Sequence, residues 1–200
     1  MKESLQAPFS SFIIRKLGTE EKVKSFDCGD ADLNDFILNE SNLYRKALLS
    51  VSYVFEAEDD VNHEHIAAYF SLANDRVSIT DFPNKTEFNR FRKHRFVNEK
   101  RLKSYPAAKI CCLAVSQELK GQHIGEFLAD SIKKFFLADN KTGCRFIVVD
   151  AYNEDKVLRY YEKNGFVPLY KTEEIEKQYY DIPQDEHLKT RLLYFDLKKD

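Results

Sequence analysis

The segment from residue 110 to residue 136 constrains the fold more than any other part of the chain. Ile110 to Ser116 is a nearly uninterrupted apolar run, the pattern of a strand buried on both faces. A short turn with Gly121 follows, and then apolar residues at helical spacing mark a long helix: Ile124, Phe127, Leu128, Ile132, Phe135 and Phe136. A buried strand that leads directly into an amphipathic helix predicts an α/β or α+β fold, in which helices flank a mixed central sheet.

Hydrophobic periodicity predicts the other elements. Further strands are expected at 11–17, 51–57, 66–73, 145–150, 167–170 and 191–197, and helices at 31–48, 86–97 and 156–164. The strands at 51–57 and 66–73 flank a polar stretch that suits a hairpin, so we expect them to pair antiparallel. Gly165 is the expected cap of the helix at 156–164. No repeat or linker divides the chain, which predicts a single domain over 1–200 with a sheet of about six to seven strands.

Composition excludes several classes of protein. The aromatic share of 14% argues against disorder. There is no apolar run of about 18 residues, and Met1 to Ser10 lacks the features of a secretory signal, so we expect a cytoplasmic protein without a membrane partner. The four cysteines show no framework spacing and are expected to be reduced structural thiols.

Two kinds of cofactor site are not expected. His63, His65 and the pair Cys111–Cys112 have no recognised ligand spacing, so no metal is predicted. Dinucleotide binding is set aside because the chain has no Gly-x-Gly-x-x-Gly.

The net charge of −2 hides a segregation of charge. Nine Lys or Arg residues against two Glu lie between Lys85 and Lys109, whereas acidic residues gather between Glu173 and Glu186. We interpret 85–109 as a basic helical insertion, which is either a solvated face or a surface for an anionic partner. In the second case phosphate contacts and stacking surfaces for a nucleic acid would come from Phe91, Arg92, His94, Arg95, Phe96 and Lys100.

The junction between the strand at 110–116 and the helix after it favours anions. The first amides of a helix lack intrahelical acceptors and sit at the positive end of its dipole, so they can bind phosphate oxygens. Gly121 and Gly125 would let the backbone approach a ligand closely. The same residues are also compatible with a simple packing role, because a strand, a glycine turn and a helix recur in many folds.

At this junction the sequence resembles the GNAT superfamily of N-acetyltransferases. Their acyl-CoA signature is Gln or Arg, two residues, Gly, one residue, then Gly or Ala. Lys120 stands where Gln or Arg is usual, His123 occupies the position of the middle Gly, and Gly125 matches. The resemblance implies acetyl-CoA as co-substrate, with its pyrophosphate at Lys120, Gly121, Gln122, His123, Ile124 and Gly125. The side chain of His123 would either crowd the pyrophosphate or donate a hydrogen bond to it.

A second match lies one strand and one helix further on. Arg159 to Phe166 is similar to the helix ending Phe-Tyr-Glu-x-x-Gly-Phe of the same family, and Tyr161 aligns with the tyrosine that acts there as general acid. The alternative interpretation of Tyr161 is an aromatic residue of the core without a catalytic role. By the same resemblance a backbone amide of Leu113, Ala114 or Val115 holds the acetyl carbonyl. Asn153 would contact the pantetheine arm or the thiol, or else bond its own loop.

A third similarity indicates which branch of this superfamily the sequence resembles. Phe26 to Phe36, with Cys28-Gly29 and Leu33-Asn34, resembles a motif of bacterial GNAT proteins that include toxins acetylating the amino group of charged tRNAs. The expected activity is therefore acetyl-CoA-dependent N-acetylation of an amine, which is a small molecule, a protein or a charged tRNA. The alternative is a non-catalytic acyl-CoA-binding or regulatory module with the same fold.

The general base and the protein partners stay open at this level. Candidates for the base are Glu56, Tyr69, Asp75 and His123. A homodimer and an antitoxin-type partner are both compatible with the resemblance.

Overall fold

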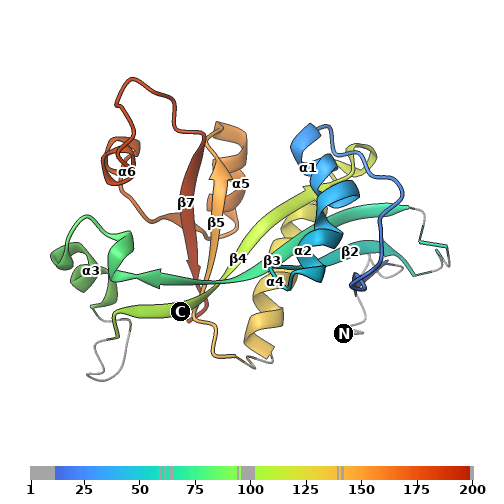
Figure 1. The fold of residues 1–200 in the computed structure, drawn as a ribbon, viewed down its shortest axis with the longest axis horizontal. Coiled ribbons are helices and arrows are strands. Elements are labelled where there is room, and N and C mark those ends of the chain that lie inside the picture. Colours follow the sequence, from blue (N-terminus) through green and yellow to red (C-terminus); the bar gives the residue numbers. More distant parts are fainter. Residues whose placement is uncertain are drawn as a thin grey trace. The chain divides into compact units, whose positions relative to one another are not determined.

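The protein is described by a computed structural model over residues 12–58, 60, 62–63, 65–93, 95, 102–138, 140 and 142–198. Figure 1 shows its helices and strands along the chain. In chain order they are β1 (Phe12–Lys16), α1 (Ala31–Asp35), η1 (Phe36–Glu40), α2 (Ser41–Lys46), β2 (Val51–Ala57), β3 (Ile66–Ser78), η2 (Ile79–Asp81), α3 (Lys85–Arg92), β4 (Ser104–Val115), η3 (Gln117–Leu119), α4 (Ile124–Ala138), β5 (Phe146–Tyr152), α5 (Asp155–Lys163), β6 (Val167–Pro168), α6 (Glu173–Tyr179) and β7 (Thr190–Asp196).

The seven strands form one sheet in the order β1-β2-β3-β4-β5-β7-β6. The pairs β1–β2, β2–β3, β5–β7 and β6–β7 are antiparallel. The neighbours β4 and β5 are joined through α4, the kind of crossover that connects parallel strands, so the sheet is mixed. The predicted fold class and the predicted antiparallel pairing of β2 with β3 are therefore confirmed.

The contacts group the chain into two compact units. The first comprises residues 1–73 and 110–132, and the second comprises residues 74–109 and 133–200. Residues of β3 and of β4 belong to both units.

The core of the first unit lies between its strands and the helical stretch from α1 to α2. Asp30 begins this stretch as N-cap, with its carboxylate accepting the amide of Leu33 at 3.0 Å. The predicted single helix at 31–48 is interrupted by η1, a π-helical turn in which the amide of Ser41 donates to the carbonyl of Phe36. The buried side chains of this core are Leu17, Phe26, Cys28, Phe36, Ile37, Val54, Tyr69 and Ala114.

The core of the second unit lies where α3 covers β4, β5 and β7. Its buried side chains are Val77, Phe82, Phe88, Tyr105, Ala107, Phe146, Val148 and Tyr194. Asn84 caps α3 by accepting the amides of Thr86 and Glu87. Gly165 follows α5 with φ +80° and donates its amide to the carbonyl of Glu162, which confirms the predicted helix ending.

Two further predicted elements differ from the structure. The strand β4 begins at Ser104 rather than near residue 110, and Cys111 is exposed with Cys112 and Leu113 only partly buried, so the interpretation of burial on both faces was wrong. Apolar composition indicates strand here but not how completely neighbours cover it. The helix α3 ends at Arg92, whereas it was predicted to reach residue 97; residues 94, 96 and 97 lie outside the described part.

The helix α6 was not predicted. Its seven residues include three Glu and lack an apolar stripe, so periodicity gives no indication of a helix. Its stabilisation comes from tertiary contacts, because the carboxylate of Glu176 is buried and accepts both the guanidinium of Arg191 at 2.5 Å and the amide of Leu192 at 2.7 Å.

Candidate active site

The turn between β4 and α4 places a run of exposed residues at the start of a long helix. The strand ends where the amide of Ser116 donates to the carbonyl of Ala67 at 2.9 Å. Residues 120–123 are exposed, and α4 then begins at Ile124, which is buried. The 15-residue helix gives the turn a positive dipole end, and Lys120 adds a cationic side chain. These features fit the binding of an anion.

The backbone of this turn adopts two left-handed conformations, at Gly121 (φ +83°) and at His123 (φ +61°). Glycine adopts this region without strain, but a residue with a Cβ does so at a cost. The GNAT signature usually has glycine where His123 stands, and the backbone has kept the conformation that suits glycine. The imidazole is largely exposed, with Nδ1 3.1 Å from the carboxylate of Glu126.

The turn before α4 is bonded to the turn before α1. Lys120 donates from Nζ to the carbonyl of Cys28 at 2.6 Å, and the amide of Gln117 donates to the carbonyl of Asp27 at 2.9 Å. A Cβ on Gly29, whose φ is +78°, would lie 3.1 Å from the side chain of Gln117. The Cys28-Gly29 motif therefore supports the turn before α4. Sequence reasoning missed this because it gave the motif no role beyond a turn.

The strand residues predicted to face the acetyl group lie just before this turn. Ala114 is buried in the core of the first unit, and Leu113 and Val115 alternate with it on the other face of β4. Cys112 faces the same core, and burial raises the pKa of its thiol to about 12. That thiol is therefore protonated and unreactive at neutral pH.

The remaining predicted residues, Asn153 and Tyr161, belong to the second unit. Asn153 follows β5, and its side chain donates to Glu173 at 2.9 Å rather than to its own loop. Hydrogen bonds from Asn153 and from Lys177 lower the pKa of Glu173 to about 2. Tyr161 lies on α5 with 6% of its surface exposed, in ring contact with Phe166 at 5.3 Å. The structure thus groups Leu113–Val115 with Lys120–Gly125 in one unit and Asn153 with Tyr161 in the other.

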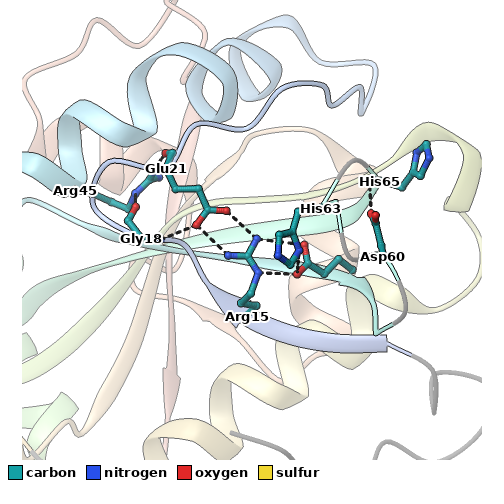
Figure 2. Close-up of polar contacts among 8 residues, drawn as sticks. Arg15, Gly18, Glu21, Arg45, Asp60, His63 and His65 are labelled. Atoms are coloured by element: carbon teal, nitrogen blue, oxygen red, sulfur yellow. Dashed lines mark hydrogen bonds and ion pairs between the residues drawn. The ribbon is translucent and has the colours of Figure 1, made fainter.

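Of the four candidates for the general base, Glu56 is the one that the structure places in a closed network. Its carboxylate is fully buried, receives the guanidinium of Arg15 at 2.6 Å and lies 2.9 Å from Nδ1 of His63. Arg15 also pairs with Glu21, whose carboxylate accepts the amide of Gly18 at 2.9 Å. Figure 2 shows Arg15 between Glu21 and His63. Because this carboxylate is fully buried, an incoming amine cannot reach it to give up a proton.

The other three candidates differ in accessibility. Tyr69 is buried, donates from its phenol to the carbonyl of Leu33 at 2.7 Å, and has its pKa raised by burial, so it is no base at neutral pH. Asp75 is exposed, and its carboxylate accepts the amide of Arg76 at 2.7 Å. His123 is exposed in the turn before α4, where Nδ1 lies beside the carboxylate of Glu126.

The basic insertion begins with α3, which carries Arg90 and Arg92 near its end. The guanidinium of Arg95 lies 4.3 Å above the ring of Phe91 and donates to the hydroxyl of Tyr194 at 2.8 Å. Phe91 packs against the core of the second unit, so it anchors the segment and is not an open stacking surface. The other predicted nucleic-acid contacts, His94, Phe96 and Lys100, lie outside the described residues.

Within the part of the chain that the structure describes, no group of three or more His, Cys, Asp and Glu side chains could hold a metal ion. Over the same residues, no helix is both long and apolar enough to cross a membrane.

Comparison with known proteins gives a family and a set of similar structures. Residues 39–166 match the family model described as the acetyltransferase (GNAT) family. A variant of KacT shares 18% identity at a TM-score of 0.67, covering 94% of this chain and 96% of that one. AtaT complexed with acetyl-methionyl-tRNAfMet shares 19% identity at a TM-score of 0.65, covering 94% of this chain and 95% of that one. A variant of the AtaT toxin bound to the C-terminus of the antitoxin AtaR and acetyl-CoA shares 18% identity at 0.64, covering 94% of each chain.

Proposed function

The chain belongs to the GNAT acetyltransferase family and is an acetyl-CoA-dependent N-acetyltransferase, and from this premise we propose a site, an acceptor and partners for it. The proposed cofactor residues of the first unit lie in the turn before α4 and on β4, and Asn153 and Tyr161 are the proposed residues of the second unit. The acceptor is the amino group of a charged tRNA. We propose that the two units act together as one catalytic domain in the cytoplasm, in which the basic helical insertion near 85–109 serves the acceptor.

The pyrophosphate of acetyl-CoA is proposed to bind at Lys120 to Gly125. The observation that carries this is the left-handed backbone at Gly121 and His123, which turns the chain into the positive end of α4. The contacts of Lys120 and Gln117 with the turn at Asp27 and Cys28 keep this backbone in place before the ligand arrives.

The thioester is proposed to lie beside β4, with a backbone amide of Leu113, Ala114 or Val115 polarising its carbonyl. The partial exposure of Leu113 and Val115 leaves this stretch of strand accessible to a ligand. Asn153 would contact the pantetheine arm, held in orientation by Glu173. Tyr161 would protonate the departing thiolate as the general acid.

The amino group of a charged tRNA is proposed as the acceptor on two supports. The first is the fold shared with AtaT, which was captured with acetyl-methionyl-tRNAfMet. The second is the set of exposed basic side chains on and beside α3, because phosphate contacts dominate the affinity of proteins for nucleic acids. The described exposed members of that set are Lys85, Arg90, Lys93 and Lys103.

An antitoxin is proposed as the protein partner. AtaT, whose fold this chain shares, binds the C-terminus of the antitoxin AtaR. We further propose that the chain forms a homodimer, because a tRNA offers a longer anionic surface than one basic insertion can cover. Light scattering of the purified chain, with and without the product of a neighbouring gene, tests both partners.

Calorimetric titration with acetyl-CoA tests the site. Wild-type protein should bind saturably, and Gly125→Leu should abolish binding, whereas Gly143→Ala, at another turn, should bind as the wild type does. A pool of charged tRNAs and radiolabelled acetyl-CoA then tests the acceptor, with label expected on the aminoacyl group. Binding without transfer to any amine would favour the non-catalytic module, and no binding at millimolar acetyl-CoA would refute the site itself.

A further inference from the structure

A charged pair lies in the middle of the sheet, where an apolar surface would be expected. Lys109 on β4 donates from Nζ to the carboxylate of Asp150 on β5 at 2.5 Å. Both strands have a neighbour on each side, so this pair is not at a sheet edge. The two side chains are nevertheless 35% and 41% exposed. This part of the sheet face is therefore open to solvent.

The alternation of side chains along β4 and β5 shows which face of the sheet is open. Tyr105 and Ala107 precede Lys109 at two-residue steps, just as Phe146 and Val148 precede Asp150, and all four belong to the buried core beneath α3. Both apolar rows thus end in a charge at the same level of the sheet. Exposed ion pairs contribute little to the stability of a fold, so stabilisation alone does not explain why a charged pair stands here.

The helix α6 borders the open patch, because the carboxylate of Glu176 accepts the amide of Leu192, the residue opposite Asp150 in the pairing of β5 with β7. The negative charges of Asp150 and Glu176 act on the phenol of Tyr180 at the end of α6, and burial together with these charges raises the pKa of Tyr180 to about 12. Tyr180 therefore stays a neutral hydrogen-bond donor with 47% of its surface exposed. Tyr152, two residues after Asp150 on the same face, is also partly exposed. A carboxylate flanked by amphipathic aromatic rings suits an organic ammonium group.

We propose that Asp150 binds the ammonium group of the acetyl acceptor and takes a proton from it, and that Lys109 is the residue that positions the carboxylate. The inference rests on the proposed function, and it supplies the base that the site otherwise lacks. Lys109 holds Oδ2, and the amine is assigned to Oδ1, since a carboxylate can accept several donors. Asn153, proposed for the thiol region, follows Asp150 by three residues.

The proton balance of the step is complete. The ammonium loses one proton to Asp150, and the neutral nitrogen forms a bond to the thioester carbonyl carbon. The C–S bond breaks with its electron pair remaining on sulfur. Tyr161 delivers its proton to the thiolate, and the second amine proton, which leaves as the amide forms, passes through solvent to restore the Tyr161 phenol. The products are the acetylated amine, the CoA thiol and the proton that Asp150 returns to solvent.

The test uses full-length protein, acetyl-CoA and two acceptors, a charged tRNA pool and methioninamide. Asp150→Asn should lower kcat/KM by about 100-fold to 10,000-fold near neutral pH and leave the affinity for acetyl-CoA unchanged. This deficit should narrow as pH rises toward the amine's own pKa of about 8, because solution then supplies neutral amine. Lys109→Met should cause a smaller loss, mainly in KM. A purely structural role would not give the pH-dependent deficit.

Two further variants keep the assignment falsifiable. Glu20→Gln breaks a matched exposed pair with Lys46 and should leave transfer unchanged. Turnover lost in Asp75→Asn but kept in Asp150→Asn would overturn the assignment in favour of the other exposed carboxylate. If the wild type acetylates an amine and Asp150→Asn does so equally well at every pH, this inference alone fails. If the wild type acetylates neither acceptor, the proposed acceptor chemistry fails and the assignment falls with it.

Discussion

The side-chain amide of Gln117 donates to the carboxylate of Asp27 at 2.7 Å, joining two turns that are ninety residues apart in sequence. The backbone amide of Gln117 makes a second bond to the carbonyl of Asp27. The carboxylate of Asp27 also accepts the amide of Gly29 at 2.8 Å. The turn that precedes α1 is thus part of the support of the turn that precedes α4.

Gly29→Ala should therefore damage the site from a distance. The new Cβ would meet the side chain of Gln117 at 3.1 Å in a left-handed backbone, so we expect a destabilisation of about 1–3 kcal/mol and weaker binding of acetyl-CoA. Gly143→Ala is the matched control, because its φ is +74° and nothing lies within 4 Å of the added Cβ. Urea denaturation and calorimetry would contradict the idea if the two variants behaved alike.

His123→Gly should stabilise the protein slightly. Removing the Cβ from a left-handed residue relieves about 1–2 kcal/mol, and the greater freedom of glycine in the unfolded chain offsets part of it, leaving about 0.5 kcal/mol. Leu48→Gly, at φ +57°, relieves the same strain away from the site. Because the imidazole is exposed beside Glu126, acetyl-CoA affinity should change little. A large loss of affinity in His123→Gly alone would show that the imidazole contacts the pyrophosphate.

Tyr161→Phe should lower kcat by about 100-fold while acetyl-CoA still binds, because the phenol is needed only when the thiolate leaves. Tyr160→Phe, one residue away on α5 and 5.0 Å from the same ring, is the control and should keep its activity. Thiol release and calorimetry measure the two effects. Equal activity of both variants would mean that Tyr161 is a core aromatic.

Glu173→Gln should remove part of the acid sensitivity of folding. The folded pKa of Glu173, about 2, lies below its ordinary 4.5, so the unfolded chain binds more protons between these values. The stabilisation is present above about pH 4.5 and is lost as pH falls toward 2. Because the side chain of Glu173 is 28% exposed, we expect its ionisation to contribute less than about 1 kcal/mol to the free energy of unfolding.

The measurement for Glu173 is the urea midpoint of each protein at pH 6 and at pH 3. The difference between wild type and Glu173→Gln should be larger at pH 6. Glu186→Gln, at an exposed position, should show no such dependence. A difference that is the same at both pH values would refute the contribution.

Long elements with strong periodicity were predictable from the sequence. The helix α4 and the strand β5 match because their apolar spacing agrees with the way they pack. The predicted signature residues Lys120 to Gly125 do lie at the junction of β4 with α4, the last two of them in the first turn of the helix, and the family prediction is confirmed by the family-model match over 39–166. The roles given to these residues remain predictions.

Features decided by partners distant in sequence could not be predicted. The helix α6 depends on the buried pair of Glu176 with Arg191, and a Glu at such a position looks solvated from sequence alone. Glu56 was one of four candidate bases, and only the fold shows that Arg15 and His63 contact its carboxylate. Asp150 was hidden by its apolar neighbours, since composition does not show where a covering helix stops.

The π-helical turn η1 gives the chain one place where it can lose a residue cheaply. A π turn contains one more residue than the α turn it replaces, and the helices on either side keep their own phase. Deleting the exposed Asn39 should let α1 and α2 merge into one α-helix, with Arg45 still directed at the carbonyl of Gly18. A deletion elsewhere in this helix would rotate Arg45 away from that carbonyl. Natural length variation in this helix is therefore expected to fall at residues 36–40.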